Sequence, residues 1–545
     1  MMTAGRRHYR GLGWLAVGLG WLAVASCSTP LQKIDRGPGG THTAPDTAVF
    51  LRPEPPDETA AAATPTPSER PMAITIEEAI VLSLENNRAL QVERLTPLIQ
   101  KTFEEQERAA FDPETRAEVG LGKEEAERLA RSGDDTESYE TETVDGVIDL
   151  TQFFPTGTTV AIEGSTGKTA SSLYRDSFYQ TRLGMTVTQA ILRGFGSDVN
   201  LAALRQAALD TRFSEYALRG FAEFLVAEVE RTYWDYALAR RQIEIFEESL
   251  KLARQQLNET EELIAVGRLA KAELPAVQAE VAAQEQGLIN ARSSMESIRL
   301  QLLRLLNPPG PGLWQREIQL IYEPTLPEVK LEDVELHVAL ARRMQPLLNE
   351  ARLGILSDDL ELVKTKNGVL PLMDLFVTLG KSGYADSFGG SVSDMDGDSY
   401  DALVGVRFEY PLRNREARAL HRRALLSRGQ SQKALENLSQ LVEVDVRTAY
   451  IEVNRAKQQI GASSATRKFD EEKLRIETEK FRVGRSTSFL LAQAQRDLLV
   501  SRITEVQALA NYLKALVDLY RQDGSLLERR GITAPGREPV ELTGN

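Results

Sequence analysis

The chain has 545 residues, of which 42% are hydrophobic and only 6% are aromatic, and its formal net charge is −14. This composition favours amphipathic helices over a single thick globular core. The negative balance excludes the basic stripe that a protein needs to neutralise nucleic-acid phosphates, so we expect no nucleic-acid partner.

The N-terminus has the pattern of a secretory signal peptide followed by a lipid-attachment site. Three arginines precede an apolar stretch over residues 11–25, which is too short for a comfortable transmembrane helix. The one cysteine of the chain, Cys27, comes directly after "VAS". "VASC" resembles the bacterial lipobox, which implies removal of residues 1–26 and a lipid anchor on Cys27; the alternative is an incidental thiol in a discarded leader. One cysteine also excludes a disulfide within the chain.

Residues 27–72 are expected to form a lipid-anchored flexible linker. Proline and small polar residues dominate "RGPGGTHTAPDTAVFLRPEPPDETAAAATPTPSERP", and no apolar periodicity interrupts them. Such a segment stays extended. Residues 524–545 have a similarly loose composition and are predicted to form a flexible tail.

Between these ends the sequence is a tandem duplication. The tripeptide Val-Gly-Arg occurs at Val266–Arg268 and again at Val483–Arg485, 217 residues later. Earlier in each copy, Pro113 and Pro371 match at an offset of 258, so the first copy carries an insertion of about forty residues. The predicted parts are a first repeat over 73–307, a connector over 308–330 and a second repeat over 331–523.

Each copy begins with a helical pattern and continues with strands of period two. Apolar and polar residues alternate over 115–121 and 183–187 in the first copy, and over 373–379 and 404–410 in the second. We expect strands of about ten residues, the length that crosses a bilayer when tilted.

A soluble sandwich would show the same alternation, but two features favour a membrane barrel. The polar faces of the strands carry charges, which fits a water-filled lumen better than a dry core. The connections over 124–143 and 381–401 are rich in polar residues and are predicted to be long loops.

Long helices follow the strands in both copies. Helical patterns without proline run over about 201–265 and 415–482, and sixty such residues extend about 90 Å. Shorter helices return to about residues 306 and 521. Apolar residues recur at three- and four-residue steps, so each pair is expected to pack as an antiparallel coiled-coil hairpin. Val-Gly-Arg then lies at the far end of each hairpin, where its glycine ends the first helix.

The repeated order of helix, strand pair and long hairpin resembles the TolC family of outer-membrane efflux proteins. "TQAILRGFG" (188–196) is similar to the family's "QPLxxG" strand exit, with Ala190 where proline is usual, and "YPLRN" (410–414) keeps the proline as Pro411. Both Val-Gly-Arg segments resemble the family's periplasmic tip motif. The resemblance covers about residues 73–521, and the lipobox indicates the lipoprotein branch of the family.

The resemblance implies a mainly α protein with a membrane β-barrel, assembled as a homotrimer. Strands from three chains would close one barrel in the outer membrane of a Gram-negative bacterium, and the hairpins would form an α-barrel across the periplasm. The function implied is a passive efflux or secretion duct, coupled by a periplasmic adaptor (membrane fusion) protein to an inner-membrane transporter. The chain would contact outer-membrane lipid and be anchored at Cys27.

No enzyme site, metal site or cofactor is expected. The sequence shows no Ser/His/Asp set, phosphate loop or CxxC, and we interpret the many helical carboxylates as solvated faces. A lipid-anchored periplasmic coiled-coil scaffold would share the linker and the helices but would not need two sets of strands. A lipid-anchored surface enzyme would lack a candidate site. The four histidines are scattered: His8, His42, His337 and His421.

The tip motifs are the candidate adaptor-docking surface. An arginine follows the glycine both times, although a helix break does not require one, and its guanidinium offers a fork of donors to backbone or carboxylates. The alternative is that the glycine merely breaks the helix. The predicted docking residues are Val266, Gly267, Arg268, Val483, Gly484 and Arg485.

The resemblance also implies a pore constriction near the tips. Family members often place an acidic residue seven positions past the motif's valine, and another three positions further on. Glu273 has the first position in the first copy, but the second copy has Leu490 and then Gln493. We therefore predict an apolar constriction at Leu490 and at most one acidic ring, from Glu273.

The insertion in the first copy contains a predicted hairpin over 147–164. "VIDLTQFFPTGTTVAIEG" holds two alternating runs around Pro155–Gly157, which suit a tight turn. The hairpin could add two strands to each chain, so that a trimer closes eighteen strands rather than the family's usual twelve. It could also fold outside or inside the barrel wall. We favour the second placement, because the α-barrel below would still offer the usual twelve helices.

Overall fold

The structure is a computed structural model that describes residues 71–542, except for 130–132, 134, 173 and 322–330. The chain divides into two compact units, Met1–Thr64 and Pro65–Asn545, and all described residues lie in the second. The predicted signal peptide, Cys27, the linker as far as residue 70 and the last part of the connector lie outside the described residues.

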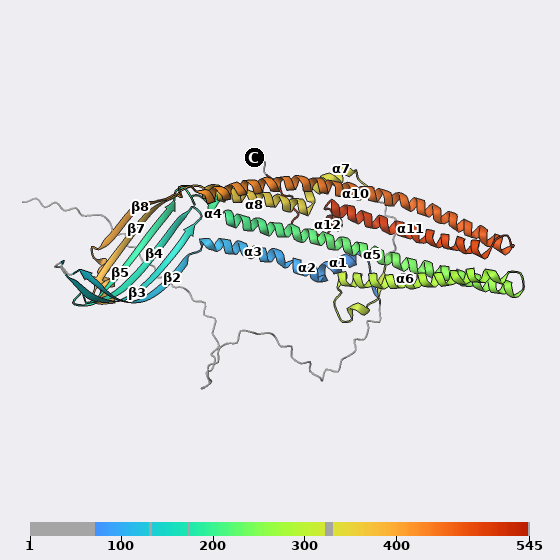
Figure 1. Cartoon of the computed structure of the whole chain (residues 1–545), viewed down its shortest axis with the longest axis horizontal. Helices are drawn as coiled ribbons and strands as arrows, with labels where there is room; N and C mark the ends of the chain where they lie inside the picture. The colour runs from blue at the N-terminus through green and yellow to red at the C-terminus, as the bar shows by residue number, and fades with distance from the viewer. Residues whose placement is uncertain (1–70, 130–132, 134, 173, 322–330, 543–545) are drawn as a thin grey trace, which may run out of the picture. The chain divides into compact units, whose positions relative to one another are not determined.

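A single antiparallel sheet joins the two copies of the duplication (Figure 1). The last strand of the first copy pairs with the first strand of the second copy, with Met185 opposite Leu379. The sheet therefore belongs to the chain as a whole and not to one repeat. Its order is β2 (Glu114–Leu129), β3 (Thr136–Phe154), β4 (Thr158–Ser171), β5 (Phe178–Ala190), β7 (Leu372–Ala385) and β8 (Tyr400–Glu409).

The strands are longer than the sequence predicts, and the long polar loop predicted over 124–143 is wrong. β2 and β3 have 16 and 19 residues and stay paired as far as Leu129 opposite Thr136. Polar residues fill this outer part of the ladder, where cross-strand ion pairs such as Lys123 with Glu140 support it. In the second copy, β7 and β8 also extend into the predicted loop, and the short helix α9 (Phe388–Ser393) lies between them.

The inserted hairpin lies inside the sheet, so our preference for a placement outside or inside the wall is wrong. β3 and β4 are the arms of this hairpin, and they separate β2 from β5. Their register aligns apolar residues with those of the next strand: Val160 lies opposite Val187, and Ile162 opposite Met185. Because both faces of the insertion match the rest of the sheet, it extends the sheet by two strands.

The turn of this hairpin explains the missing proline of the strand exit. Gly157 has a φ of +86°, and a Cβ there would lie 2.2 Å from the carbonyl oxygen of Gly194. The backbone N–H of Ala190 donates to the carbonyl oxygen of Gly157 at 2.9 Å. Proline at position 190 would have no N–H to donate. Alanine at this position therefore holds the extra turn against the strand exit.

One face of the sheet is apolar and the other is charged. The apolar side chains lie in register across all six strands and are largely exposed in the single chain, which leaves a continuous apolar surface without a cover. They include Val119, Leu121, Ile148, Ile162, Leu183, Met185, Leu379, Val404, Val406 and Phe408.

The predicted long helices are confirmed. α5 (Ala202–Ala265) has 64 residues and α10 (Arg415–Arg482) has 68, and they return as α6 (Leu274–Leu306) and α11 (Ser488–Gln522). The other helices are α1 (Ile76–Asn86), α2 (Arg88–Glu93), α3 (Leu95–Arg108), α4 (Ser197–Asn200), α7 (Val334–Met344), α8 (Pro346–Gly368) and α12 (Leu526–Arg529). Short 3-10 turns are at Ala109–Phe111, Lys271–Glu273, Leu313–Gln315 and Asp394–Asp396.

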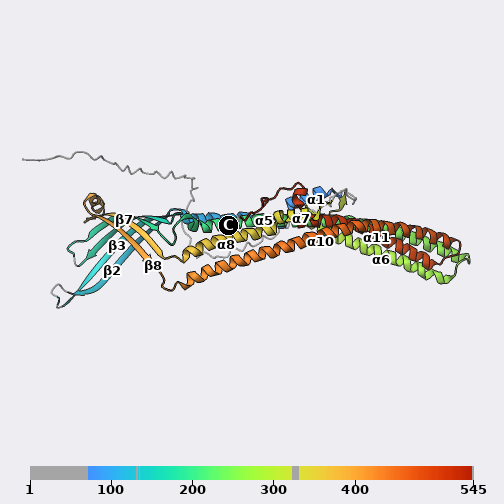
Figure 2. The same ribbon diagram turned by 90° about the horizontal axis from the view of Figure 1, so that it is seen from above.

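Next to the sheet, helices from both copies lie side by side in one layer. α3 packs on α5, α5 on α8, and α8 on α10 (Figure 1, Figure 2). α3 and α10 therefore lie at the two sides of this layer, and they lead into β2 and out of β8, the two edge strands of the sheet.

The main core lies between the layer and the tips, where the N-terminal segment packs on the long helices. The parallel pair β1 (Met72–Ile74) and β6 (Ile318–Leu320) joins α1, α5, α6 and α12 in the main core. Residues 524–542, predicted as a flexible tail, are packed: Leu526 and Leu527 are fully buried in the main core, and Val540 is 5% exposed in a separate small cluster with Tyr216 and Leu353. Two adjacent leucines among glycine, proline and charged residues gave no periodic signal in the sequence.

Equivalent hydrogen bonds support the duplication. The Asn87 side-chain amide donates to the carbonyl oxygen of Leu305 at 3.0 Å, and the Gln345 amide donates to that of Gln522 at 3.3 Å. Asn87 and Gln345 are 258 residues apart, and Leu305 and Gln522 are 217 residues apart, which are the two offsets of the duplication. Each bond ties the first helices of a copy to the end of its hairpin.

The turn at Gly157 offers a test of the six-stranded sheet. Alanine at position 157 would combine an unfavourable positive φ with a backbone clash, so we expect destabilisation above about 2 kcal/mol. Gly531 is the matched control, because its φ is +69° and nothing lies within 4 Å of a Cβ there. The thermal unfolding midpoint of the purified protein in detergent should fall clearly for Gly157→Ala and only slightly for Gly531→Ala. Equal midpoints would contradict the packing of this turn.

Candidate functional site

The two tips end their helices in the same way. After α5, Gly267 has a φ of +76°, and the backbone N–H of Arg268 donates to the carbonyl oxygen of Leu263 at 2.8 Å. After α10, Gly484 has a φ of +72°. The backbone N–H of Arg485 donates to the carbonyl oxygen of Lys480, the residue equivalent to Leu263, again at 2.8 Å. This is a glycine C-cap in the left-handed region, which satisfies the last carbonyls of a helix. The predicted role of the glycines as helix breaks is confirmed.

The side chains beside these glycines point into solvent. Val266 is 69% exposed and Val483 is 68% exposed, and both arginines are exposed. Among the residues that the structure describes, neither Arg268 nor Arg485 has a carboxylate oxygen within 4.0 Å. The tips therefore offer two apolar residues and two free guanidinium groups at the end of the unit opposite to the sheet (Figure 1, Figure 2).

Glu273 connects the first tip to the second. Its carboxylate accepts the backbone N–H of Ser488, the first residue of α11, at 3.1 Å. A carboxylate at a helix N-terminus is stabilised by the unpaired N–H groups and the helix dipole. The predicted constriction residues Leu490 and Gln493 lie on the first turns of α11 and are exposed, Leu490 by 46%. The structure thus brings Glu273 beside the N-terminus of α11, where Leu490 and Gln493 also lie. No spacing in the sequence indicates the contact between Glu273 and Ser488.

Ion pairs join α11 to the first hairpin along its length. Arg496 donates to Glu280 at 2.7 Å, and Gln284 donates to the other carboxylate oxygen at 2.6 Å. The Glu280 side chain is 1% exposed, whereas that of Arg496 is 45% exposed. Further towards the core, α11 makes the pairs Arg502–Glu248 and Lys514–Asp235. Several helical carboxylates therefore bind the two hairpins together, and the interpretation as a solvated face does not hold for the buried Glu280.

A buried charged cluster holds the residues after α11 against α5. Arg219 is 1% exposed and lies 3.2 Å from Glu223 and 2.5 Å from Glu528. Burial raises the pKa of Glu223 to about 8, although the neighbouring Arg219 opposes the shift.

The structure describes two of the four histidines, His337 and His421. His337 is the buried one, and it is paired with a carboxylate. Its Nδ1 lies 2.7 Å from the carboxylate of Asp523, and both side chains are buried. Across the described ranges, no group of three or more His, Cys, Asp and Glu side chains is placed to hold a metal ion.

On the charged face of the sheet, one arginine spans both copies. Arg182 of β5 reaches Asp401 of β8 at 2.8 Å and lies 4.0 Å from Glu163 of β4. Gly184 and Gly380 leave the space that its guanidinium occupies, since a Cβ at either position would lie within 2.7 Å of it. A sheet face that carries paired charges of this kind fits the wall of a hydrated passage.

None of the described helices combines the length and the apolar character that a membrane-spanning helix needs.

The chain matches the outer membrane efflux protein family over residues 148–308 and 362–525, one match in each copy. Its fold is similar to that of the outer-membrane channel OprN, at 16% identity with a TM-score of 0.62, covering 83% of this chain and 90% of that one. It is also similar to VceC from Vibrio cholerae (14% identity, TM-score 0.60, 82% and 96% covered). A third similar structure is CmeC from Campylobacter jejuni (13% identity, TM-score 0.60, 83% and 86% covered). Curated protein sequences give no match.

The buried pair between the hairpins predicts how firmly the tips are held. Arg496→Ala leaves the carboxylate of Glu280 buried with one partner, which should cost about 1–3 kcal/mol locally. The matched control is Arg254→Ala, because the Arg254–Glu285 pair is exposed and such pairs contribute at most about 1 kcal/mol. We expect faster amide hydrogen exchange over residues 485–500 in Arg496→Ala only. The same exchange rates in both variants would contradict the structural role of this pair.

Proposed function

Because the chain belongs to the outer membrane efflux protein family and is an outer-membrane channel component of an efflux system, we propose that three copies close into one continuous duct. The observation that carries this proposal is that the open edges coincide. β2 and β8 are the sheet edges, and α3 and α10 are the sides of the helical layer that continue from them. One neighbouring copy on each side would cover both levels at once.

The side chains at these open sides support the same assembly. A strand edge in a bilayer leaves backbone groups without partners, so the sheet must close. Three sheets of six strands would close a barrel of eighteen strands. The helical sides also carry apolar residues without a cover in the single chain: Leu95, Leu98, Ile99 and Phe103 on α3, and Leu425, Leu426, Leu441 and Ile451 on α10. A homotrimer that migrates as an oligomer on a gel unless boiled is the simplest test.

The duct serves passive passage from the periplasmic side to the outside. Its tips, with Val266–Arg268 and Val483–Arg485, would dock a periplasmic adaptor (membrane fusion) protein, which links the duct to an inner-membrane transporter. The exposed valines and free guanidinium groups support this assignment. Leu490 and Gln493 would line the constriction below the tips. Glu273, whose carboxylate is bonded to Ser488, would add at most one weak acidic ring.

The membrane side follows from the sheet. Its apolar face would contact outer-membrane lipid, and Cys27 would carry the lipid anchor at the end of the linker. The duct performs no covalent chemistry and needs no cofactor. A lipid-anchored coiled-coil scaffold is the alternative function, but an apolar face across six strands gives it no support.

Cysteine labelling tests whether the inserted hairpin forms part of the barrel wall. Val160 and Ile162 belong to the apolar face of β4, and Ala161 belongs to the charged face. A lipid-soluble thiol reagent should label Val160→Cys and Ile162→Cys but not Ala161→Cys in intact outer membranes. The parent chain, whose one cysteine is Cys27, is the control. Uniform labelling by an aqueous reagent would place the hairpin outside the membrane.

Removal of the tip arginines tests adaptor docking without breaking the turns. The C-cap bonds use backbone N–H groups, so Arg268→Ala with Arg485→Ala leaves both helix ends intact. We expect the double variant to form trimers in the membrane but to lose most export and most adaptor cross-linking. Arg292→Ala, which removes an exposed pair with Glu247, is the control. Normal export by the double variant would contradict the docking role.

A further inference from the structure

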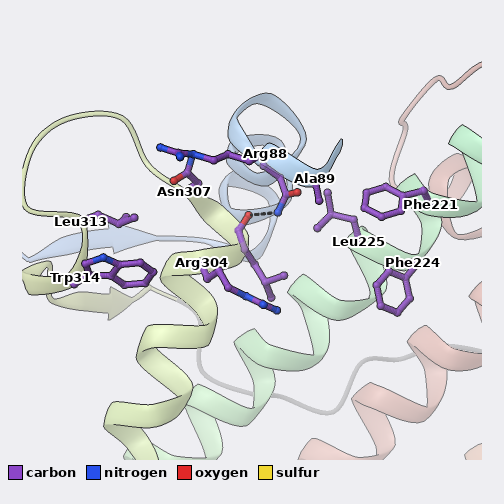
Figure 3. Close-up of a pocket in the computed structure, with 11 residues that line it drawn as sticks. Arg88, Ala89, Phe221, Phe224, Leu225, Arg304, Asn307, Leu313 and Trp314 are labelled. Atoms are coloured by element: carbon purple, nitrogen blue, oxygen red, sulfur yellow. Dashed lines mark hydrogen bonds between the residues drawn. The ribbon is translucent and has the colours of Figure 1, made fainter. Parts of the chain in front are cut away.

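A cavity of about 550 Å³ lies beside the junction of α1 and α2 (Figure 3). Its described lining includes no residue of the tips or of the six-stranded sheet. The junction forms one side, α5 and the end of α6 form others, and the loop after α6 closes it. Its volume falls in the range of small-molecule sites, about 300–1,000 Å³. The duct and its proposed docking surfaces do not use it.

Aromatic side chains form much of the wall. Phe221 and Phe224 come from α5, and Leu313 and Trp314 come from the loop after α6. Phe224 is 47% exposed and Trp314 is 50% exposed. Large aromatic rings that are partly exposed offer stacking surfaces for a flat apolar group.

Two arginines supply all the charge of the described lining. Arg304 extends from α6 toward Phe224, and Arg88 extends along the side of Asn307 (Figure 3). Among the described residues, neither guanidinium has a carboxylate oxygen within 4.0 Å, and no carboxylate lines the cavity. The cavity therefore combines free positive charge with aromatic surface.

Hydrogen bonds fix the walls in place. Asn87 donates to the carbonyl oxygen of Leu305 at 3.0 Å, and Asn307 donates in return to that of Asn86 at 2.9 Å. Arg299 donates to the carbonyl oxygen of Trp314 at 3.0 Å, which holds the loop. A ligand would therefore find most of its site formed, and less free energy would be spent on ordering it.

We propose that this cavity binds a small aromatic anion, with the aromatic group between the rings of α5 and Trp314 and the anionic group on Arg304 or Arg88. Guanidinium groups bind carboxylates, sulfonates and phosphates through paired donors. The site does not follow simply from the duplication. The position equivalent to Arg88 is Pro346 in the second copy, and the arginine equivalent to Arg304, Arg521, already lies 5.6 Å from the ring of Phe224.

Titration calorimetry of the purified full-length protein in detergent tests the site. The probe is 2-naphthalenesulfonate, compared with neutral 2-naphthol and with inorganic sulfate. We expect one sulfonate to bind per chain. In at least one of the variants Arg88→Gln and Arg304→Gln, the affinity for the sulfonate should fall by about tenfold or more. Binding of 2-naphthol and of sulfate should each be much weaker, because each lacks one half of the recognised chemistry. Trp314→Ala should also weaken binding of the sulfonate.

Arg292→Gln is the matched control, since Arg292 is an exposed arginine of α6 outside the cavity. It should bind like the parent chain, and it corrects for uptake of the probe by detergent. Equal binding by all variants, or binding of 2-naphthol as tight as that of the sulfonate, would overturn the proposal. Boiling-sensitive oligomers on a gel show that each variant is folded, and they separate this result from any failure of the duct assembly.

Discussion

The unpaired edges of the sheet are the constraint on which the rest of the structure depends. Within a bilayer no water is present to satisfy backbone N–H and C=O groups, so a sheet can lie there only if its edges are closed. In this chain β2 and β8 each have one hydrogen-bonded neighbour. Six strands are few for a barrel that surrounds a passage, so in the proposed assembly the partners for the edges come from further copies.

The helices repeat the geometry of the sheet edges and extend it. α3 leads through a 3-10 turn into β2, and α10 follows β8 in the chain, so in the proposed assembly one contact between copies would continue from strands to helices. Beyond this layer, Gly267 and Gly484 reverse the two hairpins at equivalent positions. Glu273 and Glu280 then connect the hairpins of one chain through Ser488 and Arg496. Each chain thus presents its two hairpins as one body.

Much of this arrangement could be predicted from the sequence, because repetition and period carry it. Val-Gly-Arg located both helix reversals, and alternation located strands in both copies. The extent of β2 and β3 could not be predicted, since their outer parts lack an apolar face and read as a loop. The placement of the inserted hairpin depends on long-range register. Ala190 in place of proline was the available signal, but its meaning required the partner, Gly157, to be known.

The contacts between hairpins were also beyond the sequence. A carboxylate that caps a helix more than two hundred residues away leaves no local pattern. The same holds for the cavity beside α1 and α2, whose arginines have no carboxylate oxygen of a described residue within 4.0 Å.

Disulfide mapping between the two edge strands tests the account most directly. A cysteine at Val119 of β2 would be combined in turn with one at Val404, Val406 or Phe408 of β8, all on the apolar face. Oxidation in the membrane should link at least one pair between copies, giving a covalent trimer that survives boiling and is released by reductant. Links formed only within one chain, or no links with any pair, would contradict closure of the sheet by neighbouring copies.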